Sequence, residues 1–234
     1  MNRQEEFHTD MNTGSERDGR SVPFVNYFLI AVNVLVFAAG VVLAPGGQGA
    51  DFFYRRGGLY APLILKGQDF FRLVTSIFLH ADAGHLMNNM IMQFAGGEIA
   101  ERNLGHFRYG LLYLLSGIGG NLASILADYL SGSYSYSIGA SGAVFGVTGT
   151  LLWLILEEAR ESRRSREARG QDRGLSPRLR SLVGRAGLMT VFMLYSGQVN
   201  PVVNQAAHVG GLICGFLLAA VLMPRGRRDL RGLL

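Results

Sequence analysis

Long apolar runs alternate with short polar blocks along this chain of 234 residues. A helix needs about 20 apolar residues to cross the ~30 Å hydrocarbon core of a bilayer, at about 1.5 Å of rise per residue. Apolar runs cover residues 24–44, 76–99, 109–126, 136–156, 186–195 and 203–223. The fifth run is short unless it extends over 182–199. The pattern predicts an all-α, polytopic membrane protein in which a six-transmembrane-helix bundle spans residues 23–223.

The segments outside these runs differ in character. Residues 1–22 are polar with mixed charges, which favours a flexible cytoplasmic tail, and residues 224–234 form a short basic tail. Residues 45–71 combine aromatic side chains with Pro, Gly and scattered charges, a mixture that predicts an amphipathic loop lying partly in the membrane interface. An Arg-rich cytoplasmic loop is expected at about 157–181.

The positive charge follows the connections between runs. The net charge is +5, but the positive-inside rule accounts for arginines placed beside apolar spans. Arg102 and Arg108 follow the second run, whereas the third-to-fourth and fifth-to-sixth connections have no Lys or Arg. We therefore expect no nucleic-acid partner and a multi-pass membrane protein with both termini cytoplasmic. The membrane is expected to be a bacterial inner membrane. The first loop, with Arg55, Arg56 and Lys66, is the exception to the rule.

Two polar residues near the start of apolar runs are the candidates for chemistry. Ser141 lies among small residues, and packing alone explains such a serine because small residues let membrane helices approach closely. His208 is harder to explain by packing, since an ionisable side chain inside a spanning helix is costly. Each lies about four residues inside its run, and the topology brings both helices in from the external side. Both side chains are therefore expected roughly 6–10 Å below the external surface.

Together these two residues suggest a nucleophile and its base. A serine hydroxyl is a weak nucleophile until a group such as histidine takes its proton. Their helices carry pairs of small residues that permit close approach. These pairs are Gly142 with Gly146, and Gly211 with Gly215. No acidic residue lies at the level of His208, which leaves a Ser–His dyad and not a triad.

Further residues are candidates for supporting the dyad. Phe145, one turn after Ser141, either stacks on the imidazole or is an ordinary core or lipid-facing residue. The Ser141 amide lies in the first helical turn, where N–H groups lack intrahelical partners and can donate to an oxyanion. His85 and Asn89 share one helix face and also donate hydrogen bonds, with a structural role as the alternative. His80 is expected to be structural.

Three short motifs occur in order on the second, fourth and sixth runs. They are His85-x-x-x-Asn89, Gly139-Ala140-Ser141-Gly142 and Ala207-His208-x-x-Gly211-x-x-x-Gly215. Each is weak alone, but together they resemble the rhomboid family of intramembrane serine proteases over roughly residues 24–223. The resemblance implies hydrolysis of peptide bonds in transmembrane segments of other membrane proteins, with no metal or organic cofactor. The active site would open to the external side.

The resemblance also assigns roles to individual residues. Ser141 would be the nucleophile and His208 the base, while the oxyanion site would consist of Asn89, His85 and the Ser141 amide. Phe71-Arg72 stands where many family members have Trp-Arg, in a first loop that would be a membrane-embedded hairpin. Glu101-Arg102, at the inner end of the second run, resembles a structural pair of the family.

Other functions remain open at this stage. Inactive relatives of this fold bind spanning helices without cutting them, so a membrane chaperone or adaptor is the alternative, although such relatives characteristically lack the serine or the histidine. A transporter would show internal repeats or broken helices at the midplane. An α/β-hydrolase elbow would need Gly at position 143, which is Ala, and a strand before Ser141, where we expect none. The Arg-rich loop reflects topology alone or binds anionic lipid headgroups, and the sequence assigns no oligomeric state.

Overall fold

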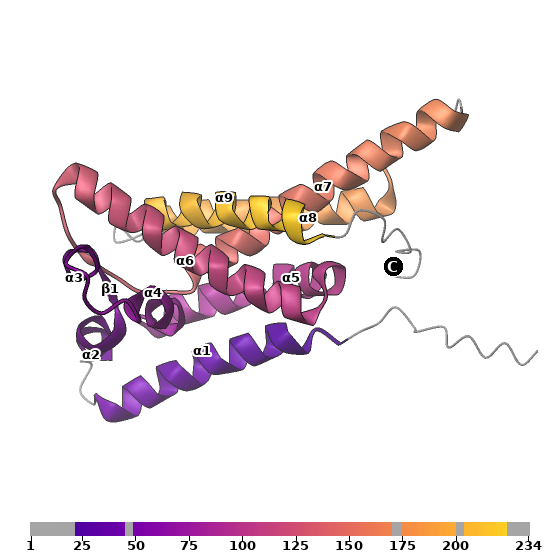
Figure 1. Ribbon diagram of the computed structural model, residues 1–234. Helices are drawn as coiled ribbons and strands as arrows, with labels where there is room; N and C mark the ends of the chain where they lie inside the picture. The colour runs from indigo at the N-terminus through magenta and orange to yellow at the C-terminus, as the bar shows by residue number, and fades with distance from the viewer. Residues whose placement is uncertain (1–21, 45–48, 170–174, 200–203, 224–234) are drawn as a thin grey trace, which may run out of the picture.

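The computed structural model describes residues 22–44, 49–169, 175–199 and 204–223. Apart from Val22, the two predicted tails lie outside the described residues. Six long helices dominate the described chain: α1 (Phe24–Leu43), α5 (Ala83–Leu104), α6 (His106–Ser131), α7 (Ser141–Arg169), α8 (Pro177–Val199) and α9 (Gln205–Leu222). In Figure 1, α1 begins and α9 ends at the same end of the bundle, as an even number of crossings requires.

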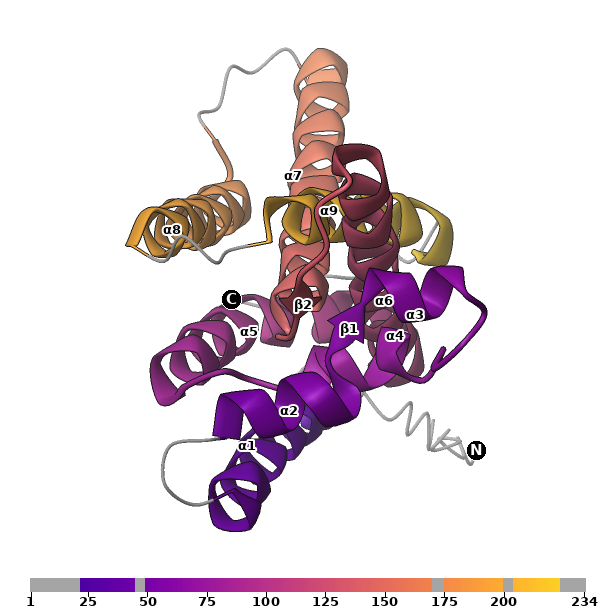
Figure 2. The same ribbon diagram turned by 90° about the vertical axis from the view of Figure 1, so that its left-hand side faces the viewer.

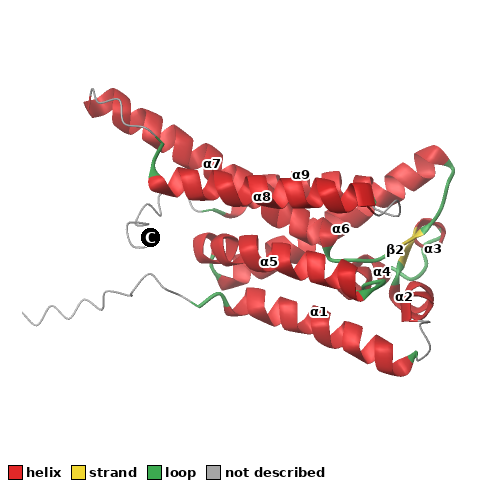
Figure 3. Ribbon diagram, turned by 180° about the vertical axis from the view of Figure 1, so that it is seen from behind, coloured by secondary structure: helices red, strands yellow, loops and turns green. Residues whose placement is uncertain are grey.

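Four of these helices are long and apolar enough to cross a membrane, and the all-α, polytopic membrane fold is thereby confirmed. They are α1, α6, α9 and, over Ser141–Arg164, α7. α5 and α8, in their described residues, do not meet the same criterion. α5 carries polar side chains such as Asn89 and Gln93, and it lies between α1 and α8 (Figure 3), where those two side chains are buried in protein. Six crossings therefore stay a prediction.

The first loop is built from short regular elements in its described residues, and its location in the membrane interface stays a prediction. It contains α2 (Gly49–Gly57), β1 (Leu59–Tyr60), α3 (Ala61–Leu65) and α4 (Arg72–Thr75). Figure 2 shows these short elements gathered at one end of the bundle, with β1 beside β2 (Tyr136–Ser137). Pro62 stands in the first turn of α3, where its missing N–H costs nothing.

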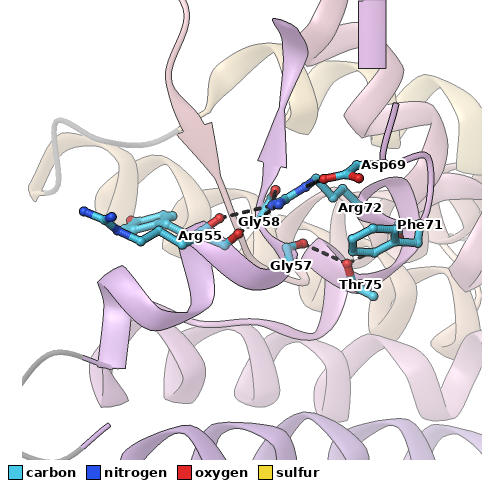
Figure 4. A network of polar contacts seen from close by, with 8 residues as sticks. Arg55, Gly57, Gly58, Asp69, Phe71, Arg72 and Thr75 are labelled. Carbon is cyan, nitrogen blue, oxygen red and sulfur yellow. Dashed lines mark hydrogen bonds and ion pairs between the residues drawn. The ribbon is translucent and has the colours of Figure 1, made fainter. Parts of the chain in front are cut away.

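Arg72 holds this compact loop together from a buried position (Figure 4). Its guanidinium donates to the carbonyl oxygens of Arg55 and Gly58, each at 2.8 Å, and pairs with Asp69 at 3.0 Å. Thr75 Oγ1 donates to the Gly57 oxygen at 2.8 Å. The carbonyls at the end of α2, which have no partners within that helix, are thus satisfied by side chains.

The second run also begins differently from the prediction. A 3-10 turn, η1, covers Ser76–Phe78, and α5 starts only at Ala83. Asp82 explains this start, because its side chain accepts from the His85 amide at 2.8 Å and caps the helix. His80 therefore lies in the link before α5.

The Arg-rich segment is mostly helical, which corrects the predicted loop at 157–181. α7 continues to Arg169, α8 begins at Pro177, and α7 projects past its neighbours in Figure 1. Arginines on the extension pair with glutamates one turn away, which stabilises an exposed helix. The pairs are Arg160 with Glu157 and Arg163 with Glu167.

α7 and α9 approach each other through glycines, as their spacing predicts. A Cβ atom at Gly211 would collide with the carbonyl oxygen of Gly142, and one at Gly215 with that of Gly146. Gly120 of α6 belongs to the same seam, since a Cβ there would lie 2.6 Å from the Ala207 oxygen. Only residues without side chains permit this approach.

At the opposite end of the bundle, Glu101 ties α1 to α5. Its buried carboxylate accepts from the backbone N–H groups of Val25, at 3.0 Å, and Asn26, at 2.7 Å. His106 Nδ1 lies 2.5 Å from the same carboxylate. A negative group at the start of α1 accepts hydrogen bonds from amides that have no intrahelical partner, and it interacts favourably with the positive end of the helix dipole. Neighbouring Arg102 pairs with Glu98 at 2.7 Å.

We expect Gly215→Ala to lower the free energy of unfolding by about 1–3 kcal/mol, because a methyl group in the α7–α9 seam forces the backbones apart. Thermal unfolding in detergent micelles measures this. Gly187→Ala on α8 is the matched control, since its added methyl meets nothing within 4 Å. Equal melting temperatures for both variants would contradict the role of the seam.

Glu101→Gln is expected to destabilise the protein by about 2 kcal/mol, because a charged acceptor shared by one buried and one partly buried amide becomes a neutral amide. Denaturant titration in micelles measures the change. Glu98→Gln serves as the control, because its partly exposed ion pair contributes about 0–1 kcal/mol. A loss no larger than the control's would refute the capping role.

Candidate active site

Ser141 is the first residue of α7. It was predicted one turn inside its helix, but Gly139 adopts φ 135°, which ends the preceding segment and delays the helix. Contrary to prediction, a strand precedes it: β2 pairs antiparallel with β1, with Ser137 opposite Leu59. This two-stranded ribbon is not the parallel sheet of a hydrolase elbow, so that exclusion stands.

The residues just before Ser141 are held by hydrogen bonds from their backbone amides. The Gly139 amide donates to the Ser76 oxygen at 2.9 Å, and the Ala140 amide points at His80 Nε2 at 3.5 Å. His80 is fully buried, and its ring packs edge-on against that of His85 with centroids 5.1 Å apart. His80, which was expected to be structural, thus lies directly behind the segment that leads to Ser141.

His208 is the fourth residue of α9 and is buried. The Phe145 ring stacks on the imidazole, with centroids 4.1 Å apart and an angle of 17° between the planes. The stacking considered from the sequence is therefore present. It restricts the imidazole to one plane, which an orienting carboxylate would otherwise do.

The structure brings the Ser141 and His208 segments together at one end of the bundle. A Cβ atom on Gly142 would lie 3.5 Å from the Ala207 oxygen, so the neighbours of the two residues are in contact. No hydrogen bond joins the Ser141 hydroxyl to His208 among those of the described residues. Such bonds are often long before substrate binds.

His85 and Asn89 face the same segment from α5. A Cβ atom on Gly139 would lie 2.8 Å from His85 Nε2 and 3.9 Å from Asn89 Nδ2. Asn89 Nδ2 donates to the His85 oxygen at 3.1 Å, and a substrate oxygen could replace that acceptor. The side chains of His85 and Asn89 therefore both lie close to Gly139, two residues before Ser141.

The remaining sequence candidates do not belong to this cluster. Arg72 organises the first loop, and Glu101 and Arg102 lie at the opposite end of α5. Within the described residues, no group of three or more His, Cys, Asp or Glu side chains could hold a metal ion.

Sequence reasoning missed Asn204, which caps α9 by accepting from the Ala207 amide at 3.0 Å. An Asn just before an apolar run is a helix-start signal and could have indicated it.

Comparison with known proteins agrees with this architecture. The Rhomboid domain model matches residues 67–225. RHOMBOID-like protein 5 of Arabidopsis thaliana is 35% identical over 185 residues, covering 76% of this chain and 52% of that protein. Rhomboid protease GluP of Bacillus subtilis (strain 168) is 30% identical over 201 residues, covering 86% of this chain and 35% of that protein. Rhomboid-like protease 1 of Toxoplasma gondii is 36% identical over 169 residues, covering 71% and 52%.

This chain spans about a third to a half of the length of these relatives. The matched domain nevertheless covers more than half of the chain and contains all three motifs. It also includes three of the four helices that are apolar enough to cross a membrane. This integral membrane protein therefore belongs to the rhomboid family.

Proposed function

We propose that the protein is an intramembrane serine endopeptidase that cleaves transmembrane segments of other membrane proteins. The observation that carries this is the contact of α7 with α9 beside Ser141, where Phe145 stacks on His208. Two of the relatives compared above are named proteases, which supports the same reading.

The chemistry follows from the residues in the cluster. His208 takes the proton from the Ser141 hydroxyl as the oxygen attacks the substrate carbonyl carbon. The negative charge that develops on the carbonyl oxygen is stabilised by the Ser141 amide, Asn89 Nδ2 and the His85 ring. His208 then returns the proton to the leaving amine, and a water molecule, deprotonated in the same way, hydrolyses the acyl-enzyme.

The proposed orientation follows the positive charge. The Arg-rich extension of α7 and both termini would be cytoplasmic, which places Ser141 near the external surface and its water supply on that side. The relatives come from a plant, a bacterium and Toxoplasma, so the bacterial inner membrane stays a prediction.

A non-catalytic chaperone or adaptor is the second candidate. RHOMBOID-like protein 5 carries no protease in its name, and the Ser141 hydroxyl makes no described hydrogen bond to His208. The presence of both residues favours the enzyme. A serine-directed fluorophosphonate separates the two functions, because only an activated serine is labelled.

Ser141→Ala is expected to abolish both fluorophosphonate labelling and substrate cleavage, a loss of at least about 10³-fold, because the nucleophile is gone. Its melting temperature in micelles should match that of the wild type. Ser133→Ala, an exposed serine in the same connection, is the control and should keep full activity. Cleavage that survives in Ser141→Ala would rule out this residue as the nucleophile.

Asn89→Ala is expected to lower kcat by about 10²–10³-fold with little change in KM, because one donor to the oxyanion is lost. Asn88→Ala, the neighbouring residue on another helix face, should stay close to the wild type. Steady-state cleavage of a fluorogenic transmembrane peptide in liposomes measures both constants. Equal effects of the two substitutions would exclude Asn89 from the oxyanion site.

A further inference from the structure

Asn204 joins the two chain segments that lead to the proposed catalytic residues. Its Oδ1 accepts from the Ala207 amide at 3.0 Å and so caps α9, four residues before His208. Its Nδ2 donates to Ser137 Oγ at 3.1 Å. Ser137 ends β2, four residues before Ser141. A single side-chain amide therefore connects the two segments, and each connected residue lies four positions before a proposed catalytic residue.

A third hydrogen bond anchors this amide to the bundle. Asn204 Nδ2 also donates to Ser124 Oγ on α6 at 2.6 Å, and Ser124 is buried. An NH₂ group has two hydrogens, so it can serve both serine oxygens while the carbonyl oxygen caps α9. β2 is held in place, because it pairs with β1 and because the Gly139 amide donates to the Ser76 oxygen. Moving α9 relative to β2 would break at least one of the Asn204 bonds.

We infer that Asn204 is a positioning residue, which rests on the function proposed above. It holds the start of α9 against β2 and thereby keeps His208 in register with Ser141. Such a link matters because the two proposed catalytic groups come from different helices, and no carboxylate of the described residues orients the imidazole. A misplacement of about 1 Å can cost on the order of 10²-fold in rate.

The test separates the Asn204–Ser137 bond from its neighbours. Asn204→Ser keeps a side-chain oxygen that caps α9, but the serine is too short to reach Ser137 on β2 or Ser124 on α6. Ser137→Ala removes the other partner of the same bond. Both are expected to lower kcat on the order of tenfold with unchanged KM, measured with the fluorogenic transmembrane peptide in liposomes. Because they remove one shared bond, the double variant should lose little more than either single variant.

Two control variants sharpen the comparison. Ser124→Ala removes the same type of acceptor from the same Nδ2, but on α6, and should keep a kcat near that of the wild type. Asn204→Asp should restore activity, because a carboxylate accepts from the Ala207 amide and from both serine hydroxyls. Melting temperatures in micelles are recorded for every variant, since a purely structural role would lower stability and kcat together.

A loss of kcat in Asn204→Ser and Ser137→Ala, recovered in Asn204→Asp, supports the inference. A wild-type kcat in either variant overturns it, as does an equal loss in Ser124→Ala that follows the melting temperature. If the wild-type protein neither cleaves the peptide nor reacts with the fluorophosphonate, the proposed function itself fails and the inference falls with it. Wild-type cleavage with unaffected variants refutes the inference alone.

Discussion

The close approach of α7 and α9 is the constraint on which the site depends. Lipid tails are as apolar as leucine side chains, so membrane helices associate by close packing and not by burying apolar surface from water. Glycines at 142 and 146 face glycines at 211 and 215, and backbone oxygens occupy the places where side chains would stand. Because backbones this close leave little freedom in register, the residues at the start of each helix are brought together as a consequence.

Polar groups in this protein are distributed according to the same physics. An unsatisfied hydrogen-bonding group inside a bilayer costs several kcal/mol. The buried charged residues Glu101 and Arg72 each form hydrogen bonds with backbone groups. Glu101 accepts from the first amides of α1, and Arg72 donates to the last carbonyls of α2. Both satisfy helix ends that have no partners of their own. Their contribution to the site is indirect, since they hold the elements around α5 in place.

The apolar runs predicted the all-α membrane fold and the order of its long helices, because hydropathy at this length leaves few alternatives. Helix ends were less predictable, since capping at Asp82 and a left-handed turn at Gly139 moved two of them by several residues. The short elements between 49 and 75 depend on Arg72, whose backbone carbonyl partners lie 14 to 18 residues away in sequence. Such contacts have no local signature. Residue chemistry indicated Ser141, His208, His85 and Asn89 as site candidates, and their roles stay a proposal. The helix cap at Asn204 had a local signal, but its bonds to Ser124 and Ser137, 80 and 67 residues away, had none.

Among the described residues no carboxylate lies beside His208, and in the proposed dyad the stacked Phe145 ring takes over one of its roles. In a triad, the acid selects the tautomer and fixes the ring plane. Here Phe145 fixes the plane by stacking, and a neutral aromatic ring achieves this without placing a second charge in a low-dielectric environment. Stacking leaves rotation within the ring plane unrestricted, so the position of α9 along its axis must set the distance from His208 to Ser141. The Asn204 cap at the start of α9 and the glycine seam along α9 both restrict the position of this helix along its axis.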